Sequence, residues 1–139
     1  MTPDEIARKC ADLMWADDKA SRALDATIEH VAPGAADVSM TVRETMTNGH
    51  GMCHGGYIFT LADTAFAFAC NTYNQRCVAQ HCSISFVAPA QLGMRLRASA
   101  RERQRSGRSG VYDVTVTEET GAVVAEFRSL SRTVAGTFF

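Results

Sequence analysis

The sequence predicts an α+β fold in which a curved antiparallel sheet of about six strands wraps around one long central helix. The helix is predicted because residues 56–73 are almost entirely apolar, lack the alternation of a strand and are too numerous for one. A helix that is apolar all round belongs in a core. The sheet is predicted because alternating apolar and polar residues, separated by short turns, occur on both sides of this helix.

The segment before the central helix contains a short helix, two strands and a loop. Residues 2–5 form a capping-box pattern with proline at the first helical position, which predicts an N-terminal helix through about Met14. Residues 26–42 are predicted to form two short strands around the turn at Pro33. Residues 47–56 form a loop with four glycines that leads into the central helix.

Four further strands are predicted after the central helix. The turns between them contain Pro89, residues 106–110 and residues 119–121, and we interpret all three as hairpin connections. No internal repeat or linker interrupts this order, so residues 1–139 are expected to form one domain. The predicted strands cover residues 78–87, 94–105, 111–118 and 123–134.

The composition is that of an ordinary globular protein, with 46% hydrophobic and 21% charged residues. The net charge of −1 gives no general attraction to nucleic acid, so no nucleic-acid partner is expected. The apolar residues 57–70 are fewer than the roughly 20 that cross a bilayer, so no membrane association is expected either. The charged N-terminal segment lacks the apolar core of a signal peptide, which predicts a cytoplasmic protein.

The five cysteines form no C-x-x-C pair, which indicates reduced thiols rather than a disulfide framework. His50, Cys53 and His54 are the one cluster with the residue types of a zinc site. No second pair has the spacing of a zinc finger, and the neighbours His81 and Cys82 would point to opposite faces of a strand. We therefore expect no metal.

Asp63 is the only charged residue between Tyr57 and Cys70. An unpaired carboxylate in apolar surroundings costs several kcal/mol or acquires a raised pKa. The functional interpretation is a nucleophile or a general base toward water, with its basicity increased by burial. The structural alternatives are a carboxylate satisfied by Thr60 or Thr64, or one that faces solvent along a narrow polar stripe.

Gly55 and Gly56 leave backbone N–H groups bare at the positive end of the helix, where such groups can polarise a carbonyl. Alternatively, they only permit a tight turn. Gly55 precedes Asp63 by eight residues, or about 12 Å along a helix. A nucleophile and a polarising donor must each lie within about 3.5 Å of the reacting group. If both serve one reaction, they come from two chains, which implies a homodimer with antiparallel central helices.

Three residues of the glycine-rich loop are further candidates. Cys53 lies near the helix start beside His54 and could attack an acyl group, although adjacent loop residues rarely form such a pair. His54 could donate from its ring, or it could brace the loop. Asn48 could reach a bound ligand, or it could hold the loop.

Five arginines occupy positions of one parity along a predicted strand, which places all of them on one face. That face is either solvated or binds phosphate groups, such as those of coenzyme A. Arg108, in the following glycine-rich turn, is a similar candidate for substrate binding. The five are Arg95, Arg97, Arg101, Arg103 and Arg105.

Residues 48–71, NGHGMCHGGYIFTLADTAFAFACN, resemble the phenylacetic acid degradation (PaaI) thioesterases of the hotdog superfamily. The resemblance extends through residues 110–114 and through Phe127-Arg128 in the last strand, so it covers most of the chain from about residue 25. It implies the hotdog fold. It also implies hydrolysis of an acyl-CoA, expected to be an aryl-acetyl or hydroxyaryl-acetyl ester, to the free acid and CoA.

The resemblance also implies site residues and assembly. The catalytic carboxylate of the family falls on Asp63. The helix-start glycine that polarises the thioester carbonyl falls on Gly55, and Gly56 is expected to bind the substrate. The family's preceding His and Asn match His54 and Asn48. Members of the family form dimers or dimers of dimers and need no metal, so we expect a homodimer, assembled as a dimer of dimers, without a cofactor.

Two alternatives remain open from the sequence. One is a hotdog hydratase or dehydratase acting on an enoyl-CoA, although the sequence lacks the His and Pro patterns and the Asp-x-Asn-x-x-His run of those enzymes. The other is a dimer that binds acyl-CoA without consuming it. A charge in the central helix disfavours the second alternative because such a charge is costly to keep without a use.

Overall fold

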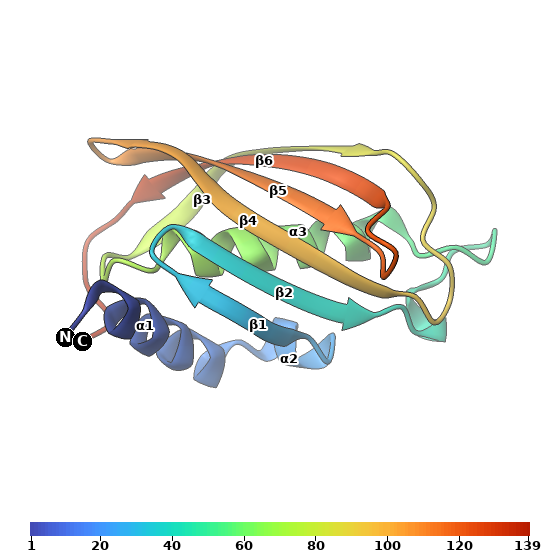
Figure 1. Cartoon of the computed structure of the whole chain (residues 1–139), viewed down its shortest axis with the longest axis horizontal. Coiled ribbons are helices and arrows are strands. Elements are labelled where there is room, and N and C mark those ends of the chain that lie inside the picture. The colour runs from blue at the N-terminus through green and yellow to red at the C-terminus, as the bar shows by residue number, and fades with distance from the viewer.

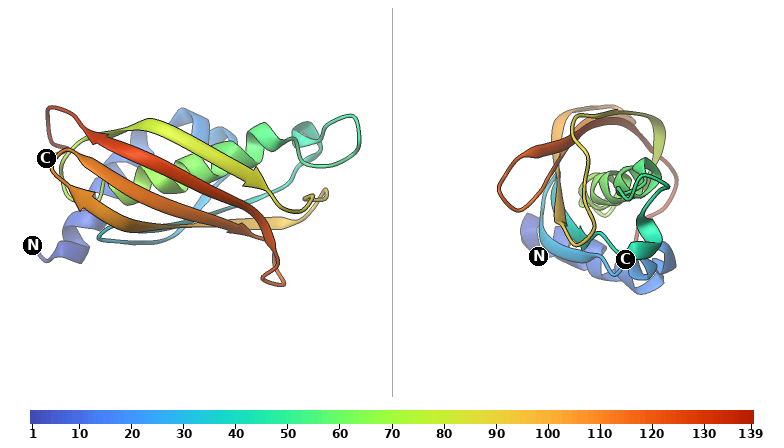
Figure 2. Two further views of the ribbon diagram at one scale, coloured as in Figure 1. Left: turned by 90° about the horizontal axis from the view of Figure 1, so that it is seen from above. Right: turned by 90° about the vertical axis from the view of Figure 1, so that its right-hand side faces the viewer.

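The sheet has six antiparallel strands in the order β1-β2-β4-β5-β6-β3 in the computed structural model, which describes residues 1–139 (Figure 1). The α+β prediction and the number of strands are confirmed, and the sheet curves around the helix α3, as the end-on view shows (Figure 2). The strands are β1 Thr27–Ala32, β2 Ala35–Thr41, β3 Cys77–Phe86, β4 Arg95–Ser106, β5 Ser109–Thr117 and β6 Val123–Thr133.

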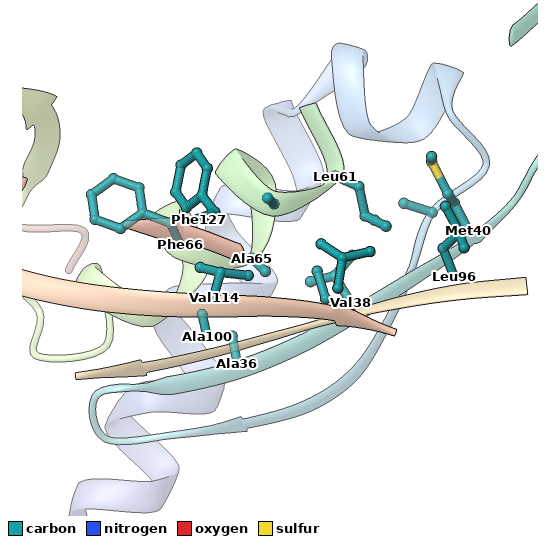
Figure 3. Close-up of a cluster of buried hydrophobic side chains, with 14 of the residues drawn as sticks. Ala36, Val38, Met40, Leu61, Ala65, Phe66, Leu96, Ala100, Val114 and Phe127 are labelled. Atoms are coloured by element: carbon teal, nitrogen blue, oxygen red, sulfur yellow. The ribbon is translucent and has the colours of Figure 1, made fainter. Parts of the chain in front are cut away.

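The central helix α3 spans Gly55–Cys70 and ends three residues earlier than the sequence predicts. Asn71 ends it, with a C-cap N–H that donates to the Ala67 carbonyl. Its apolar side chains fill the concave side of the sheet, where Leu61 and Phe66 lie among Val38, Leu96, Val114 and Phe127 (Figure 3). None of the helices has both the length and the apolar character that crossing a membrane requires.

The N-terminal helix α1 spans Pro3–Asp17 and has the predicted capping box, in which the Thr2 hydroxyl accepts from the Glu5 N–H and the Glu5 carboxylate accepts from the Thr2 N–H. A short helix, α2 Lys19–Ala23, follows directly. α1 packs beside β1, and its Trp15 ring lies 6.5 Å from the ring of Phe68 in α3. This packing places α1 beside the edge strand β1.

The predicted hairpin at Pro89 is wrong. β3 pairs with β6 along its length, whereas β4 pairs with β2 and β5, so the chain between β3 and β4 crosses from one side of the sheet to the other. The crossing segment also contacts the loop before α3, since the Cys53 N–H donates to the Ala90 carbonyl at 2.8 Å. Turn residues alone do not indicate which strands pair. The remaining hairpins, β1-β2, β4-β5 and β5-β6, are confirmed.

The prediction that the five arginines share one face is also wrong, because β4 contains a bulge. The register with β5 shifts between Glu102 and Gln104, so the alternation changes phase after Arg103. Arg105 consequently lies on the concave side, with its guanidinium 3.5 Å from the centre of the Tyr73 ring. A bulge inserts one residue without leaving a signal in the apolar pattern.

The expectation that α3 is buried on every side holds for most of the helix but not for one stripe. Nine residues of α3 are buried, while Phe59, Thr60, Asp63 and Ala67 are only partly buried and Gly56 is exposed. These five positions recur every three or four residues and therefore lie on one side of the helix. The sheet of a single chain does not cover this side.

Candidate active site

The first residue of α3 presents a free backbone donor. His54 is the N-cap residue, and its Nδ1 atom accepts from the Gly56 N–H at 2.9 Å. Because Nδ1 accepts, the neutral ring carries its proton on Nε2, which the exposed imidazole can offer to a ligand. The Gly55 N–H donates to no group of the chain. Of the two helix-start N–H groups in the prediction, Gly55 is therefore the one available to a substrate oxygen.

The loop that leads into α3 is held from within by Asn48. Its side-chain oxygen accepts from the N–H groups of His50 at 2.9 Å and Met52 at 3.3 Å, and its backbone N–H donates to the Met52 carbonyl at 2.8 Å. The His54 N–H donates to the Met46 carbonyl at 2.7 Å. Asn48 thus braces the loop that positions the helix start, which is the structural interpretation of this residue.

The geometry does not support Cys53 as a nucleophile. The side chain is buried, and burial raises the pKa of its thiol. The sulfur lies 3.7 Å from the His54 carbonyl oxygen rather than beside a base. A reactive cysteine needs the opposite conditions, an accessible thiol with a lowered pKa.

A mainly apolar hollow of about 290 Å³ lies beside Gly55, and the loop before α3, the first turn of α3 and the end of β3 line it. Met52, Ile58 and Phe86 contribute to its wall. The Phe86 ring lies so close to Gly55 that a Cβ atom on residue 55 would be 2.8 Å from it, although 54% of the Phe86 surface is exposed. A larger residue at position 55 would therefore displace the Phe86 ring, and the free Gly55 N–H lies next to an apolar space.

Asp63 has no hydrogen-bond or ion-pair partner in the chain. Burial raises the pKa of its carboxyl above the ordinary value, and no neighbouring cation lowers it. The predicted alternative of satisfaction by neighbouring threonines does not hold. The Thr60 hydroxyl donates to the Gly56 carbonyl at 2.9 Å, and the Thr64 hydroxyl donates to the Thr60 carbonyl at 2.7 Å. Asp63 lies on the partly exposed stripe of α3, so its carboxylate is both basic and accessible.

Arg108 is not close to these groups within one chain. It belongs to the turn between β4 and β5, which lies at the same end of the molecule as the two termini, whereas the loop before α3 lies at the other end (Figure 1). β4 alone has twelve residues, or about 40 Å of extended chain. Arg108 is exposed and forms no ion pair.

Four of the other five arginines pair with acidic residues on the convex face. Arg97 and Arg101 each lie 2.8 Å from Asp37, whose pKa is held below its ordinary value by these two partners although burial opposes the shift. Arg95 lies 3.8 Å from Glu29, and Arg103 lies 3.3 Å from Asp113. Each of these four arginines is thus engaged by a carboxylate, which favours the solvated interpretation over a phosphate site.

Sequence reasoning missed Phe86. In the sequence it is one apolar residue at the end of a strand, 31 positions after Gly55, and the two meet only because β3 runs past the start of α3. A weak signal was available in the run of apolar and proline residues 86–90, which continues beyond the end of the strand.

Comparison with known proteins identifies relatives over most of the chain. The family model of the thioesterase superfamily matches residues 50–125. The chain is 42% identical over 127 residues to the acyl-coenzyme A thioesterase PaaI of Escherichia coli K12, covering 91% of each protein. The solved structure of the E. coli PaaI protein from the phenylacetic acid degradation operon superposes with a TM-score of 0.96, at 40% identity, and the match covers 98% of this chain and 99% of that chain.

A more distant structure shares the fold and contains a ligand. The smu.793 protein of Streptococcus mutans, solved with bound acetyl-CoA, superposes with a TM-score of 0.73 at 28% identity, and the match covers 76% of this chain and 85% of that chain. The predicted hotdog fold and the predicted resemblance are confirmed by these matches. The chain belongs to the thioesterase superfamily, and the predicted enzyme class, a thioester hydrolase, is confirmed with it.

Proposed function

We propose that this protein hydrolyses acyl-CoA thioesters, with an aryl-acetyl or hydroxyaryl-acetyl group as the acyl part, and releases the free acid and CoA. The observation that supports this most directly is that α3 carries both a carboxylate without a partner, Asp63, and a backbone N–H without a partner, Gly55. Hydrolysis of a thioester needs both a base or nucleophile and a donor for the oxygen that becomes negative. The E. coli relative is itself named an acyl-CoA thioesterase.

In the proposed reaction, the Gly55 N–H donates to the thioester carbonyl oxygen, which accumulates negative charge in the tetrahedral transition state. Asp63 either removes a proton from the attacking water or attacks the carbonyl carbon itself, forming an anhydride that water then hydrolyses. In both routes the carbon–sulfur bond breaks and the CoA thiolate leaves. The His54 Nε2–H, on the N-cap residue of the same helix, is proposed to assist at the same oxygen.

The distance between the two groups supports a homodimer. Eight residues of α3 separate Gly55 from Asp63, or about 12 Å, so one carbonyl cannot contact both in one chain. Two surfaces of the chain suit a second copy. One is the partly exposed stripe of α3, and the other is the edge of β3, a ten-residue strand that pairs on one side only and is mostly exposed. Pairing of two β3 edges brings two α3 helices together in antiparallel orientation.

We assign the acyl group to the hollow beside Gly55. Phe86, Ile58 and Met52 offer an apolar wall to an aromatic ring, and the Gly55 N–H lies where the carbonyl next to that ring would be. Replacement of Phe86 by alanine should therefore raise KM for phenylacetyl-CoA far more than for acetyl-CoA. Arg108 is proposed to bind the nucleotide end of a CoA held mainly by the partner subunit, since the two ends of one chain are far apart.

The test is a panel of CoA esters monitored for free thiol with purified protein. We expect phenylacetyl-CoA and its ring-hydroxylated analogue to be hydrolysed faster than acetyl-CoA. Absence of thiol release from every ester, together with tight binding of the same esters, would indicate a binding protein. Reversible water addition to an enoyl-CoA without thiol release would indicate a hydratase. A single turnover in ¹⁸O-labelled water, followed by mass analysis of Asp63, separates direct attack from activation of water.

A further inference from the structure

The arm, the loop of residues 47–54 that leads into α3, projects beyond the rest of the chain along the direction of the helix (Figure 1). Its tip, residues 49–51, is exposed, and a Cβ atom on Gly49 or Gly51 would meet no other side chain or backbone within 4 Å. Hydrogen bonds to Asn48 within the loop fix the shape of the arm. The arm is therefore preformed and has free space around its tip, so docking it costs little conformational entropy.

A hollow of about 480 Å³ lies at the opposite end of α3, and the end of that helix, the start of β3, α1 and the C-terminal segment line it. Three of its apolar side chains remain exposed, Leu13 by 40%, Val78 by 50% and Val134 by 38%. The charged residues of the lining are Asp17, Asp18 and Arg76. Exposed apolar side chains that gather at one place, with polar groups around them, mark an interaction site.

Antiparallel pairing of two α3 helices brings the arm of one chain level with the hollow of the other. When Gly55 lies beside Asp63 of the partner subunit, residues before Gly55 lie level with residues that follow Asp63 of the partner subunit. Asn71, which lines the hollow, comes eight residues after Asp63, or about 12 Å further along the axis. Gly51, at the tip of the arm, comes four residues before Gly55, and four extended residues reach up to about 13 Å. The two distances agree, so the tip and the hollow lie at the same level.

The side chains on the two surfaces also match. Val87 and Leu92 belong to the segment that follows β3 beside the arm, and they are 60% and 56% exposed. Antiparallel pairing of the β3 edges carries this segment toward the start of the partner's β3, where Val78 and the other exposed apolar residues of the hollow lie. The His50 ring, at the tip of the arm, can donate a hydrogen bond to the Asp17 carboxylate of the hollow. Two copies related by a twofold axis therefore bury both apolar groups at once.

We infer that the arm of each subunit docks in the hollow of the other subunit, between its α1 and its C-terminal segment. The occupant of the hollow is thus a second copy of this chain. The inference rests on the proposed function, since it uses the same antiparallel pairing, and it goes further by assigning two surfaces that the reaction itself does not require. Each active site then receives from the partner both Asp63 and the surface that holds the loop before His54 and Gly55.

The test is a cross-link between two full-length chains that carry different cysteine substitutions. A chain with His50→Cys and a chain with Leu13→Cys are coexpressed with different affinity tags, purified and treated with a short bismaleimide. Peptide mapping should show a link between positions 50 and 13 of different chains. The matched control replaces Leu13→Cys with Arg8→Cys, because Arg8 is exposed on the same helix but does not line the hollow. The link to position 13 should form about tenfold faster than the link to position 8, because docking raises the local concentration of the two thiols.

Native mass and thiol release from CoA esters, measured on the same samples, separate this inference from the proposed function. Cys77 lines the same hollow, so a link from position 50 to Cys77 of the partner subunit also supports docking. Equal rates at positions 13 and 8 overturn the inference. A dimer that hydrolyses the esters but links position 50 to neither position 13 nor Cys77 overturns the docking alone. A linked dimer that releases no thiol supports the docking and contradicts the hydrolysis, and a monomer overturns the docking together with the composite site.

Discussion

The Gly55 N–H and the Asp63 carboxylate lie on one unbroken helix, about 12 Å apart along its axis, and neither forms a hydrogen bond within the chain. Polar groups at partly buried positions are normally paired. Two that remain unpaired, one a donor and one a basic acceptor, are available to a substrate. The length of helix between them is the physical reason to expect that each active site combines Gly55 of one subunit with Asp63 of another.

Replacement of Asp63 by asparagine should lower kcat for aryl-acetyl-CoA by about 10²–10⁴-fold, because the amide neither attacks the thioester nor takes a proton. The matched control is Asp113→Asn, which removes a carboxylate that pairs with Arg128 and Arg103 on the convex face. That variant should retain kcat. Near-normal turnover by Asp63→Asn, measured as thiol release, would contradict the assigned role.

The pH dependence of turnover should reflect the environment of Asp63. Since burial raises the pKa of this carboxyl, the carboxylate form required for catalysis should be lost at a higher pH than the ordinary aspartate value of about 3.9. We expect kcat/KM to fall with decreasing pH through that raised value, with a single ionisation on the acid side. A profile that stays flat down to the ordinary aspartate value would be inconsistent with a buried catalytic carboxylate.

Asp63 should also reduce the stability of the folded protein at neutral pH. Because its pKa is raised on folding, the folded protein binds more protons than the unfolded chain between the ordinary and the raised pKa, so the free energy of unfolding falls as the pH rises through this window. At pH 7, the free energy of unfolding of Asp63→Asn should therefore be higher than that of the wild type. The advantage should vanish below the ordinary aspartate pKa. Urea unfolding at equal protein concentration measures it, and a variant less stable than the wild type at pH 7 would refute the prediction.

The Gly55 N–H can be removed without breaking the helix. Gly55 is the first residue of α3, where proline is tolerated, and the preceding His54 has the extended backbone (φ −61°, ψ 133°) that a following proline requires. Gly55→Pro should lower kcat by about 10²–10³-fold, as loss of an oxyanion donor does. Gly55→Ala is the steric control, since it also introduces a Cβ against Phe86 but keeps the N–H. Equal losses in both variants would indicate that crowding, rather than the lost donor, lowers the rate.

Composite sites predict that two inactive variants restore activity when mixed. In a dimer of one Asp63→Asn chain and one Gly55→Pro chain, one site carries both defects and the other carries neither. Random exchange of subunits in equal amounts should thus restore about a quarter of the wild-type activity, because half of the dimers are mixed and half of their sites are intact. Sites contained within one chain would give no recovery. Exchange is checked independently by native mass spectrometry of the mixture.

The fold was predictable from the sequence because each element leaves a local signal. The capping box of α1, the unbroken apolar run of α3 and the alternation in the strands depend on near neighbours, and all appear at the predicted places within a few residues. The errors concern contacts between distant segments. The bulge that turns Arg105 to the concave side, and the pairing of β3 with β6 instead of β4, leave no local pattern.

For the candidate site, the sequence by itself determined a helix that starts at a glycine pair and contains one carboxylate, because charge, glycine content and helical rise follow from residue order alone. Only the tertiary structure decided that Asp63 lies on the one uncovered side of α3, that the Gly55 N–H is free while His54 caps Gly56, and that Phe86 lies against Gly55. These facts depend on how far the sheet curves around the helix and on which segment packs at its first turn. Such properties arise from packing among residues far apart in the chain, which no local pattern encodes.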